Sequence, residues 1–146
     1  MRRSGAHALA LAALFTLGAC RGGSEIDVRD AYVERAVPGT SVSAGYFDMQ
    51  NHGDAAIALI GASCDAARAI ELHEHVLDGD MMRMRKLDSV SIGAGERVTF
   101  APGGRHLMIF DLDPNARSPV VIRFTFADHA PVAVEFAVRD RAGADG

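Results

Sequence analysis

Hydrophobic and polar residues alternate along most of this chain, and a period of two is typical of β-strands. Between residues 120 and 126, Val120, Ile122, Phe124 and Phe126 fall on one face, because successive side chains of a strand point to opposite faces. No stretch after residue 25 keeps a helical period for more than two turns. The pattern predicts strands at residues 26–34, 41–50, 55–63, 68–76, 81–87, 96–100, 105–112, 119–128 and 131–140.

Turn-forming residues separate these segments, with Pro38-Gly39, Asp78-Gly79 and the glycine-rich stretches 93–95 and 102–104 as examples. Short strands at regular spacing are typical of antiparallel sandwiches and barrels with Greek-key connections. The sequence has no internal repeat and no low-complexity segment. We therefore expect an all-β fold in a single domain over residues 26–140, followed by a disordered tail at 141–146.

The N-terminal segment reads as an export signal. Arg2 and Arg3 precede an apolar run at residues 8–19, which is shorter than the roughly 20 residues that span a bilayer. Leu17 lies three residues before Cys20, which resembles the lipobox of bacterial lipoproteins. We expect residues 1–19 to be removed, Cys20 to be lipidated and residues 20–25 to form a flexible tether to a membrane. The alternative is ordinary signal cleavage without a lipid.

Charge and cysteine content exclude several classes of function. The only charged residues among residues 1–19 are Arg2 and Arg3, so removal of this segment changes the formal net charge from -4 to -6. A mildly acidic chain without a basic cluster is not expected to bind nucleic acid or an anionic lipid surface. Cys64 is the single cysteine of the predicted domain, and there is no CxxC motif, so neither a disulfide framework nor thiol–disulfide exchange is expected. No catalytic triad or paired-carboxylate motif is recognisable, so we do not expect an enzyme.

The segment 71–87 predicts a hairpin that is unusually rich in histidine and methionine. Asp-Gly is favoured in two-residue type I′ loops, because both positions tolerate positive φ. A loop at Asp78-Gly79 would place Leu77 opposite Asp80 and so set the register of the whole hairpin.

That register would bring metal-binding side chains to one face. His73 would oppose Met84 and His75 would oppose Met82, at the roughly 5 Å that separates opposed Cβ atoms. It would also place two acidic residues opposite basic ones, Glu71 opposite Lys86 and Glu74 opposite Arg83.

A second cluster lies at His106 and Met108, which share a face of a predicted strand. One His and one Met from each cluster would make a site of two imidazoles and two thioethers. Such a neutral, soft ligand set favours Cu(I), whereas zinc sites use Cys or more His, and blue copper needs a thiolate. The alternative is a structural lipoprotein on which solvated histidines and core methionines meet by chance.

These residues resemble the PCuAC family of periplasmic copper chaperones. Its signature is His, ten residues, Met, twenty-one residues and then His-x-Met, and His73, Met84, His106 and Met108 match both spacings. The stretches "ELHEH" and "PGGRHLMIFDL" add to the resemblance, which extends over residues 26–139.

The resemblance implies a cupredoxin-like β-sandwich outside the cytoplasmic membrane, with these four residues as Cu(I) ligands. It further implies a copper acceptor such as cytochrome c oxidase subunit II and a thioredoxin-like assembly partner. His75 and Met82 lie outside the motif, and we favour neighbours over spare or transfer ligands for both. A copper buffer or resistance protein without a dedicated acceptor is the main alternative to a chaperone.

Overall fold

A computed structural model describes residues 25–141, which form ten β-strands. Their bounds are β1 Ile26–Glu34, β2 Val42–Asn51, β3 Ile57–Ser63, β4 Ala69–Asp78, β5 Met81–Leu87, β6 Val90–Ile92, β7 Arg97–Phe100, β8 Arg105–Phe110, β9 Val120–Phe126 and β10 Val132–Arg139.

The predicted export signal, Cys20, the tether up to residue 24 and the tail from residue 142 lie outside the described residues. Within residues 25–141, no helix is long and apolar enough to cross a membrane.

Each predicted strand segment overlaps one observed strand, and the structure adds the short strand β6. Three residues, Val90 to Ile92, are too few to show an alternating pattern. Pairing decides this element, because Ile57 opposes Ile92 and Leu59 opposes Val90 across β3 and β6. Strand β4 also runs two residues further than expected, to Asp78.

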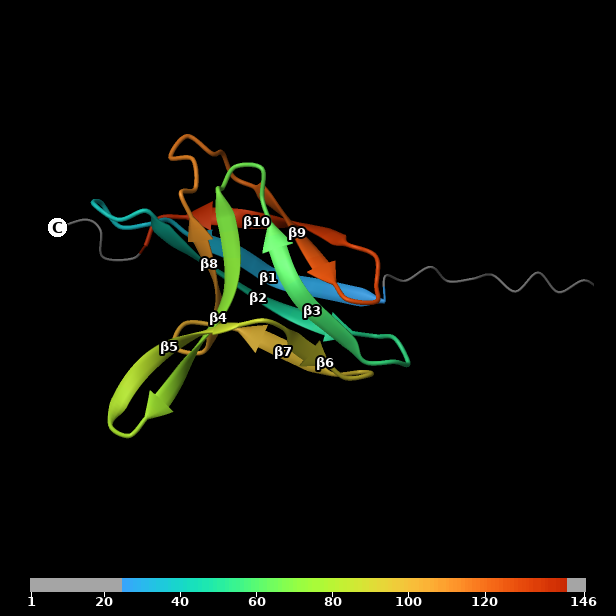
Figure 1. Cartoon of the computed structure of the whole chain (residues 1–146). Helices are drawn as coiled ribbons and strands as arrows, with labels where there is room; N and C mark the ends of the chain where they lie inside the picture. The colour runs from blue at the N-terminus through green and yellow to red at the C-terminus, as the bar shows by residue number, and fades with distance from the viewer. Residues whose placement is uncertain (1–24, 142–146) are drawn as a thin grey trace, which may run out of the picture.

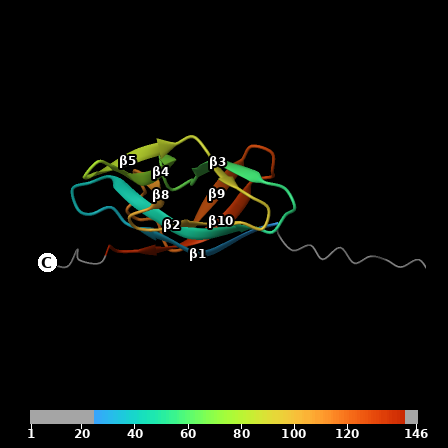
Figure 2. The same ribbon diagram turned by 90° about the horizontal axis from the view of Figure 1, so that it is seen from below.

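The strands close into a barrel-like sandwich. Hydrogen-bonded pairs connect β4, β8, β2, β1, β10, β9 and β3 in that order, and β3 pairs back with β4. Most pairs are antiparallel, while β1–β10 and β7–β8 are parallel. Figure 2 shows β3, β4 and β5 along one side and β1, β2 and β10 along the other. The expected all-β sandwich or barrel is confirmed.

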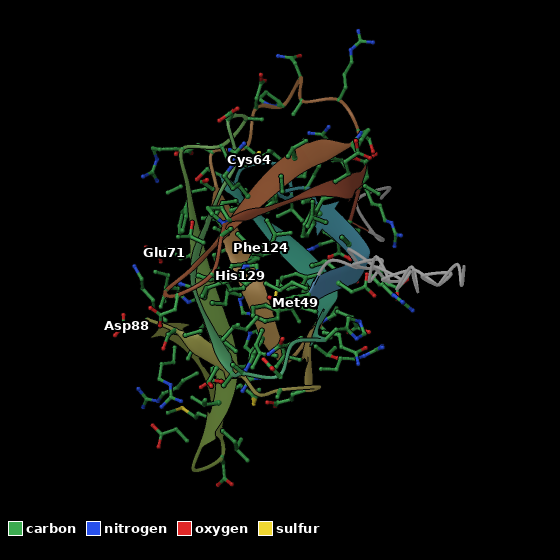
Figure 3. The ribbon with its side chains drawn as sticks, turned by 90° about the vertical axis from the view of Figure 1, so that its right-hand side faces the viewer. Met49, Cys64, Glu71, Asp88, Phe124 and His129 are labelled. Carbon is green, nitrogen blue, oxygen red and sulfur yellow. The ribbon has the colours of Figure 1, made fainter. Side chains whose placement is uncertain are left out.

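Alternation along the strands builds the core. In β9 every second side chain from Val120 to Phe126 is buried and the ones between are exposed, as the pattern predicts. Phe47 stacks on Phe100 at 4.4 Å between ring centroids and contacts the ring of Phe124 at 4.8 Å. Figure 3 shows Phe124 and Met49 in the interior. The same core includes Leu59 of β3 and Leu72 of β4, so strands from both sides share the hydrophobic interior.

Strand β8 approaches β2 closely at Gly45. A Cβ atom on Gly45 would lie 3.1 Å from both Cβ and Cδ1 of Leu107, and 3.3 Å from Cδ1 of Ile109. Both neighbours are buried, so there is little free space for a side chain. The absence of a side chain at Gly45 therefore sets how closely β8 lies against the barrel.

A buried amide holds the turn that follows β2. Asn51 donates through Nδ2 to the carbonyls of Ala55, Ile92 and Gly93 at 2.8, 3.2 and 3.1 Å, and its Oδ1 accepts from the Gly53 amide at 2.9 Å. These bonds satisfy polar groups that burial would otherwise leave unpaired. Asn51 thereby joins the end of β2 to the end of β6.

Candidate metal centre

The hairpin of β4 and β5 has a different register from the one expected. Asp78 opposes Met81, so the two-residue loop is Gly79-Asp80 rather than Asp78-Gly79. Gly79 has φ of 63°, and neither Asp78 nor Asp80 is among the positive-φ residues. This is the pattern of a type II′ turn, which needs positive φ only at its first central residue. The type I′ prediction was wrong because it required Asp78 to take that conformation as well.

The new register changes partners but keeps the faces. His75 now opposes Met84, and His73 opposes Lys86. Because the slip moves the pairing by two residues, and side chains alternate with a period of two, His73, His75, Met82 and Met84 still share one face.

Ion pairs support the observed register. Lys86 Nζ lies 2.8 Å from Glu71 Oε1, so the expected Glu71–Lys86 pair forms across a diagonal. Glu74 binds Arg85 instead of the expected Arg83. Arg83 contacts Asp78 at 2.7 Å, near the turn. These partly exposed pairs each contribute well under about 1 kcal/mol and tune the register more than the stability.

Strand β8 brings the second cluster beside the first. On the other side of β4 from β5, His106 opposes His73 and Met108 opposes Glu71. The hairpin projects from the body of the barrel in Figure 1, and β8 lies where β4 enters it. Three neighbouring strands therefore carry all four motif residues on one face.

His106 is the most enclosed of the histidines on this face, with 5% exposure. Its Nδ1 lies 3.1 Å from the Gly104 carbonyl oxygen, which can only accept, so Nδ1 carries the proton and Nε2 keeps a free lone pair. Burial lowers the pKa of His106, the carbonyl bond opposes that shift, and the nearby His75 and His73 lower the pKa further. A neutral imidazole with a fixed tautomer is the form that binds a metal.

His73 is held in the complementary way. Its Nε2 lies 2.9 Å from Glu71 Oε2, so Nε2 donates to the carboxylate and Nδ1 is the free nitrogen. That Nδ1 is buried and has no hydrogen-bond partner among residues 25–141. Hydrogen bonds from His73 and Lys86 lower the pKa of Glu71, which keeps it ionised as an acceptor. Glu71 itself lies on the outer side of the barrel (Figure 3).

The two motif methionines flank this histidine pair from opposite directions. Met84 opposes His75, and Met108 opposes Glu71. His75 and Glu71 each lie two residues, or about 6.6 Å, along β4 from His73. Met84 is 50% exposed and Met108 is half-buried. The structure thus places His73 directly opposite His106, while each methionine is level with a residue two positions along β4 from His73, one in each direction.

His75 is much closer to the centre than the sequence suggested. Its ring stacks on His106 with 4.9 Å between centroids, compared with 6.1 Å between His73 and His106. The sequence signal that could have revealed this is the turn type, since Gly79 as the first loop residue moves His75 opposite Met84. Met82 opposes Leu77, further out on the hairpin.

Other candidate groups lie elsewhere. His52 is 4.0 Å from Asp27 Oδ2, and His129 is 3.4 Å from Glu25 Oε2. Cys64 is a free, partly buried cysteine packed against the core. A cavity of about 440 Å³ lies between the segments 35–43 and 111–114, away from the histidine face. Within residues 25–141, no three His, Cys, Asp or Glu side chains converge on a metal-sized site as they stand.

The chemistry of this face is that of a soft-metal site. Imidazole nitrogens with free lone pairs share this face with neutral thioether sulfurs, and this donor set suits copper better than zinc or magnesium. Nδ1 of His73 and Nδ1 of His75 are both buried without a hydrogen-bond partner among residues 25–141, and a metal ion would satisfy such groups.

Comparison with known sequences identifies relatives of this chain. Residues 26–138 match the model of a family described as "Putative lipoprotein LpqE-like". A protein of Leifsonia xyli subsp. xyli, "Putative lipoprotein Lxx21020", is 32% identical over 125 residues, covering 82% of this chain and 73% of that protein.

Solved structures share the fold. The copper-bound PCuAC domain from PmoF2 superposes with a TM-score of 0.67 at 20% identity, over 80% of this chain and 94% of that domain. The Cu(I) form of DR1885 from Deinococcus radiodurans has a TM-score of 0.61 at 25% identity, over 75% of this chain and 74% of that one. The expected cupredoxin-like fold and the resemblance to PCuAC domains are confirmed, and the four ligand positions stay a prediction.

Proposed function

This chain belongs to the LpqE-like family, and on that premise we propose that it is an extracytoplasmic Cu(I) metallochaperone. It would bind one Cu(I) through His73, Met84, His106 and Met108 and hand the ion to an acceptor protein. The observation that carries the proposal is the pair of opposed histidines, His73 and His106, each with one nitrogen occupied by an oxygen acceptor and the other left free.

The names of similar proteins support the two halves of the proposal. A relative is described as a lipoprotein, which fits lipidation at Cys20 and tethering to a membrane outside the cytoplasm. Two structurally similar domains are described as copper-bound or Cu(I)-bound, which fits copper as the cargo. These structural neighbours are copper-binding domains rather than enzymes, in keeping with a protein that carries a metal without transforming a substrate.

The arrangement suits transfer as well as binding. His106 is buried, so it would hold the ion at the barrel, whereas Met84 is half exposed on an edge strand paired only with β4. An acceptor ligand could approach from the Met84 side and displace the thioether first. Since all four ligands are neutral, no charge has to be separated when the ion leaves.

We propose the binuclear copper centre of cytochrome c oxidase subunit II as the acceptor, with a thioredoxin-like protein as the assembly partner. Both follow from the resemblance of the four-residue motif to the PCuAC signature. No nucleic-acid partner is proposed, because the net charge of -4 is acidic and the basic side chains of the hairpin are paired with carboxylates.

The first experiment is a Cu(I) titration of the purified protein against a colorimetric chelator. We expect tight one-to-one binding that is lost when Met84→Ala and Met108→Ala are combined. Met81→Ala is the matched control, because Met81 is a similarly exposed methionine of β5 whose side chain points to the opposite face from Met84.

The outcomes separate the alternatives. Binding that is absent, or as strong in the double variant, would mean that the His/Met face is ordinary surface, as in a structural lipoprotein. Binding without transfer of copper to the metal-free oxidase domain would instead favour a copper buffer. Transfer that requires Met84 would support the chaperone.

A further inference from the structure

His75 lies between the buried imidazole and the exposed thioether of the proposed site. It stacks on His106 at 4.9 Å between ring centroids, and it directly opposes Met84 in the β4–β5 pairing. His73, which the four-residue motif includes, is further from His106 at 6.1 Å and opposes Lys86. The observed register thus gives His75 the position next to Met84 that the expected register gave to His73.

Two of the histidines on this face have a buried ring nitrogen without a hydrogen-bond partner. Nδ1 of His75 is buried without a hydrogen-bond partner among residues 25–141, and the same is true of Nδ1 of His73. A buried polar atom without a hydrogen bond destabilises the folded state, so two such atoms around one buried imidazole need an explanation. A metal ion bound by these nitrogens would provide one.

We infer that His75 is a third imidazole ligand, and that His73, His75 and His106 together form a site for Cu(II) on the face that binds Cu(I). This inference rests on the proposed copper-binding function and extends it to the second oxidation state. Cu(II) prefers nitrogen and oxygen donors, while the soft thioethers favour Cu(I). The face therefore has a nitrogen-rich part and a sulfur part, which share His73 and His106.

The ring separations are suitable for a shared ion. With metal–nitrogen bonds of about 2.0–2.1 Å, two imidazoles on one ion have centroids about 4.5 Å apart when they bind at right angles and about 6.3 Å apart when trans. The observed 4.9 and 6.1 Å fall in that range. Because the His75 and His106 rings are stacked, they present faces rather than nitrogens to each other, and the three side chains do not converge as they stand. A turn of the His75 ring about χ2, which is a broad torsion in histidine, would bring a nitrogen toward the ion.

The test uses the full purified chain and Cu(II) buffered with glycine. Electron paramagnetic resonance reports the number of bound nitrogens, and competition with glycine reports the affinity. We expect one Cu(II) with three imidazole nitrogens, and at least tenfold weaker Cu(II) binding with one nitrogen fewer in His75→Ala. His129→Ala is the matched control, because His129 contacts Glu25 and Phe126 instead. His75→Gln serves as a second variant if His75→Ala does not fold.

The same proteins are titrated with Cu(I) so that the two proposals fail separately. Cu(I) affinity within threefold of the parent in His75→Ala, together with the loss of Cu(II), would support this inference. Unchanged Cu(II) binding in both His75 variants, or Cu(I) binding without any Cu(II) binding in the parent, would overturn this inference alone. Failure to bind either ion would overturn the proposed function as well.

Discussion

At the scale of single residues, hydrogen bonds to oxygen choose which nitrogen of each histidine can bind a metal. Gly104 accepts from Nδ1 of His106, and Glu71 accepts from Nε2 of His73. Neither oxygen can donate, so the lone pairs left over are Nε2 on one ring and Nδ1 on the other. Outer partners of this kind orient a ligand before the metal arrives.

Copper affinity is expected to depend on pH through these imidazoles. An imidazole must be neutral to bind Cu(I), and its ordinary pKa is about 6.5. We expect the affinity to fall as the pH decreases below that value, with the share due to His106 appearing at lower pH because burial lowers the pKa of that residue. Chelator competition at about pH 7.5 and pH 5 measures the change. Equal affinities at both values would argue against histidine ligation.

The stability of the protein without added metal should also depend on pH at His106. Its folded-state pKa is lowered, so the unfolded state binds more protons in the interval below the ordinary pKa. The contribution to the free energy of unfolding is therefore full above about pH 6.5 and declines as the pH falls toward the folded pKa.

Urea unfolding across this interval tests the assignment. His106→Asn keeps a side-chain N–H near the Gly104 carbonyl but does not titrate, so its stability should decline less on acidification than that of the parent. A variant with the same pH dependence as the parent would show that His106 does not carry the effect.

At the scale of elements, two glycines decide where the proposed ligands lie. One is in the loop between β4 and β5, and the other is at the contact between β2 and β8. Gly79 takes the positive φ that starts the hairpin loop, and this sets the β4–β5 register. Gly45 admits β8, which carries His106 and Met108, close against β2. Both effects are due to the backbone and not to any ligand side chain.

Gly45→Ala is expected to lower the free energy of unfolding by about 1–3 kcal/mol, which is typical of overpacking. The new Cβ would meet Leu107 at 3.1 Å, so β8 would have to shift, and Cu(I) affinity should fall with it. Gly61→Ala in β3 is the matched control, because a Cβ there meets nothing within 4 Å. Equal effects of the two substitutions in a denaturant titration would show that the close approach at Gly45 is unimportant.

At the scale of the whole molecule, the proposed site joins the projecting hairpin to the closed barrel. β5 pairs only with β4, whereas β8 pairs with β4, β2 and β7. An ion held by Met84 and His106 would add a link across β4 that the backbone pairing does not provide. Binding to the folded state alone also raises stability, by about 4 kcal/mol when free ligand is 1,000 times its dissociation constant.

Hydrogen exchange can detect that link. We expect Cu(I) to slow the exchange of amides in residues 81–87, because the ion would restrain the edge strand against opening. β6, at the other end of the sheet order, is the internal control and should not change. Protection that appears equally in both edge strands would indicate general stabilisation instead of a link through Met84.

Much of this fold follows from local pattern. The alternation in β9 predicts its buried face because the backbone of any strand points successive side chains to opposite faces, whatever surrounds it. The same alternation predicts that one face carries His73, His75, Met82 and Met84. The prediction holds although the predicted register was wrong, because a shift of two residues leaves every side chain on the same face. The four motif positions came from the resemblance of the spacing to the PCuAC signature, and as copper ligands they stay a prediction.

The tertiary structure decided which of those residues are neighbours. Val90–Ile92 is too short to predict a strand from its own pattern, and it forms one by pairing with β3. The closure of the barrel places β8 beside β4 and so His106 opposite His73, and a single positive φ at Gly79 gives His75 the position next to Met84. Face is a property of one strand and can be deduced from the sequence, whereas register and cross-strand neighbours depend on turns and on closure of the whole sheet.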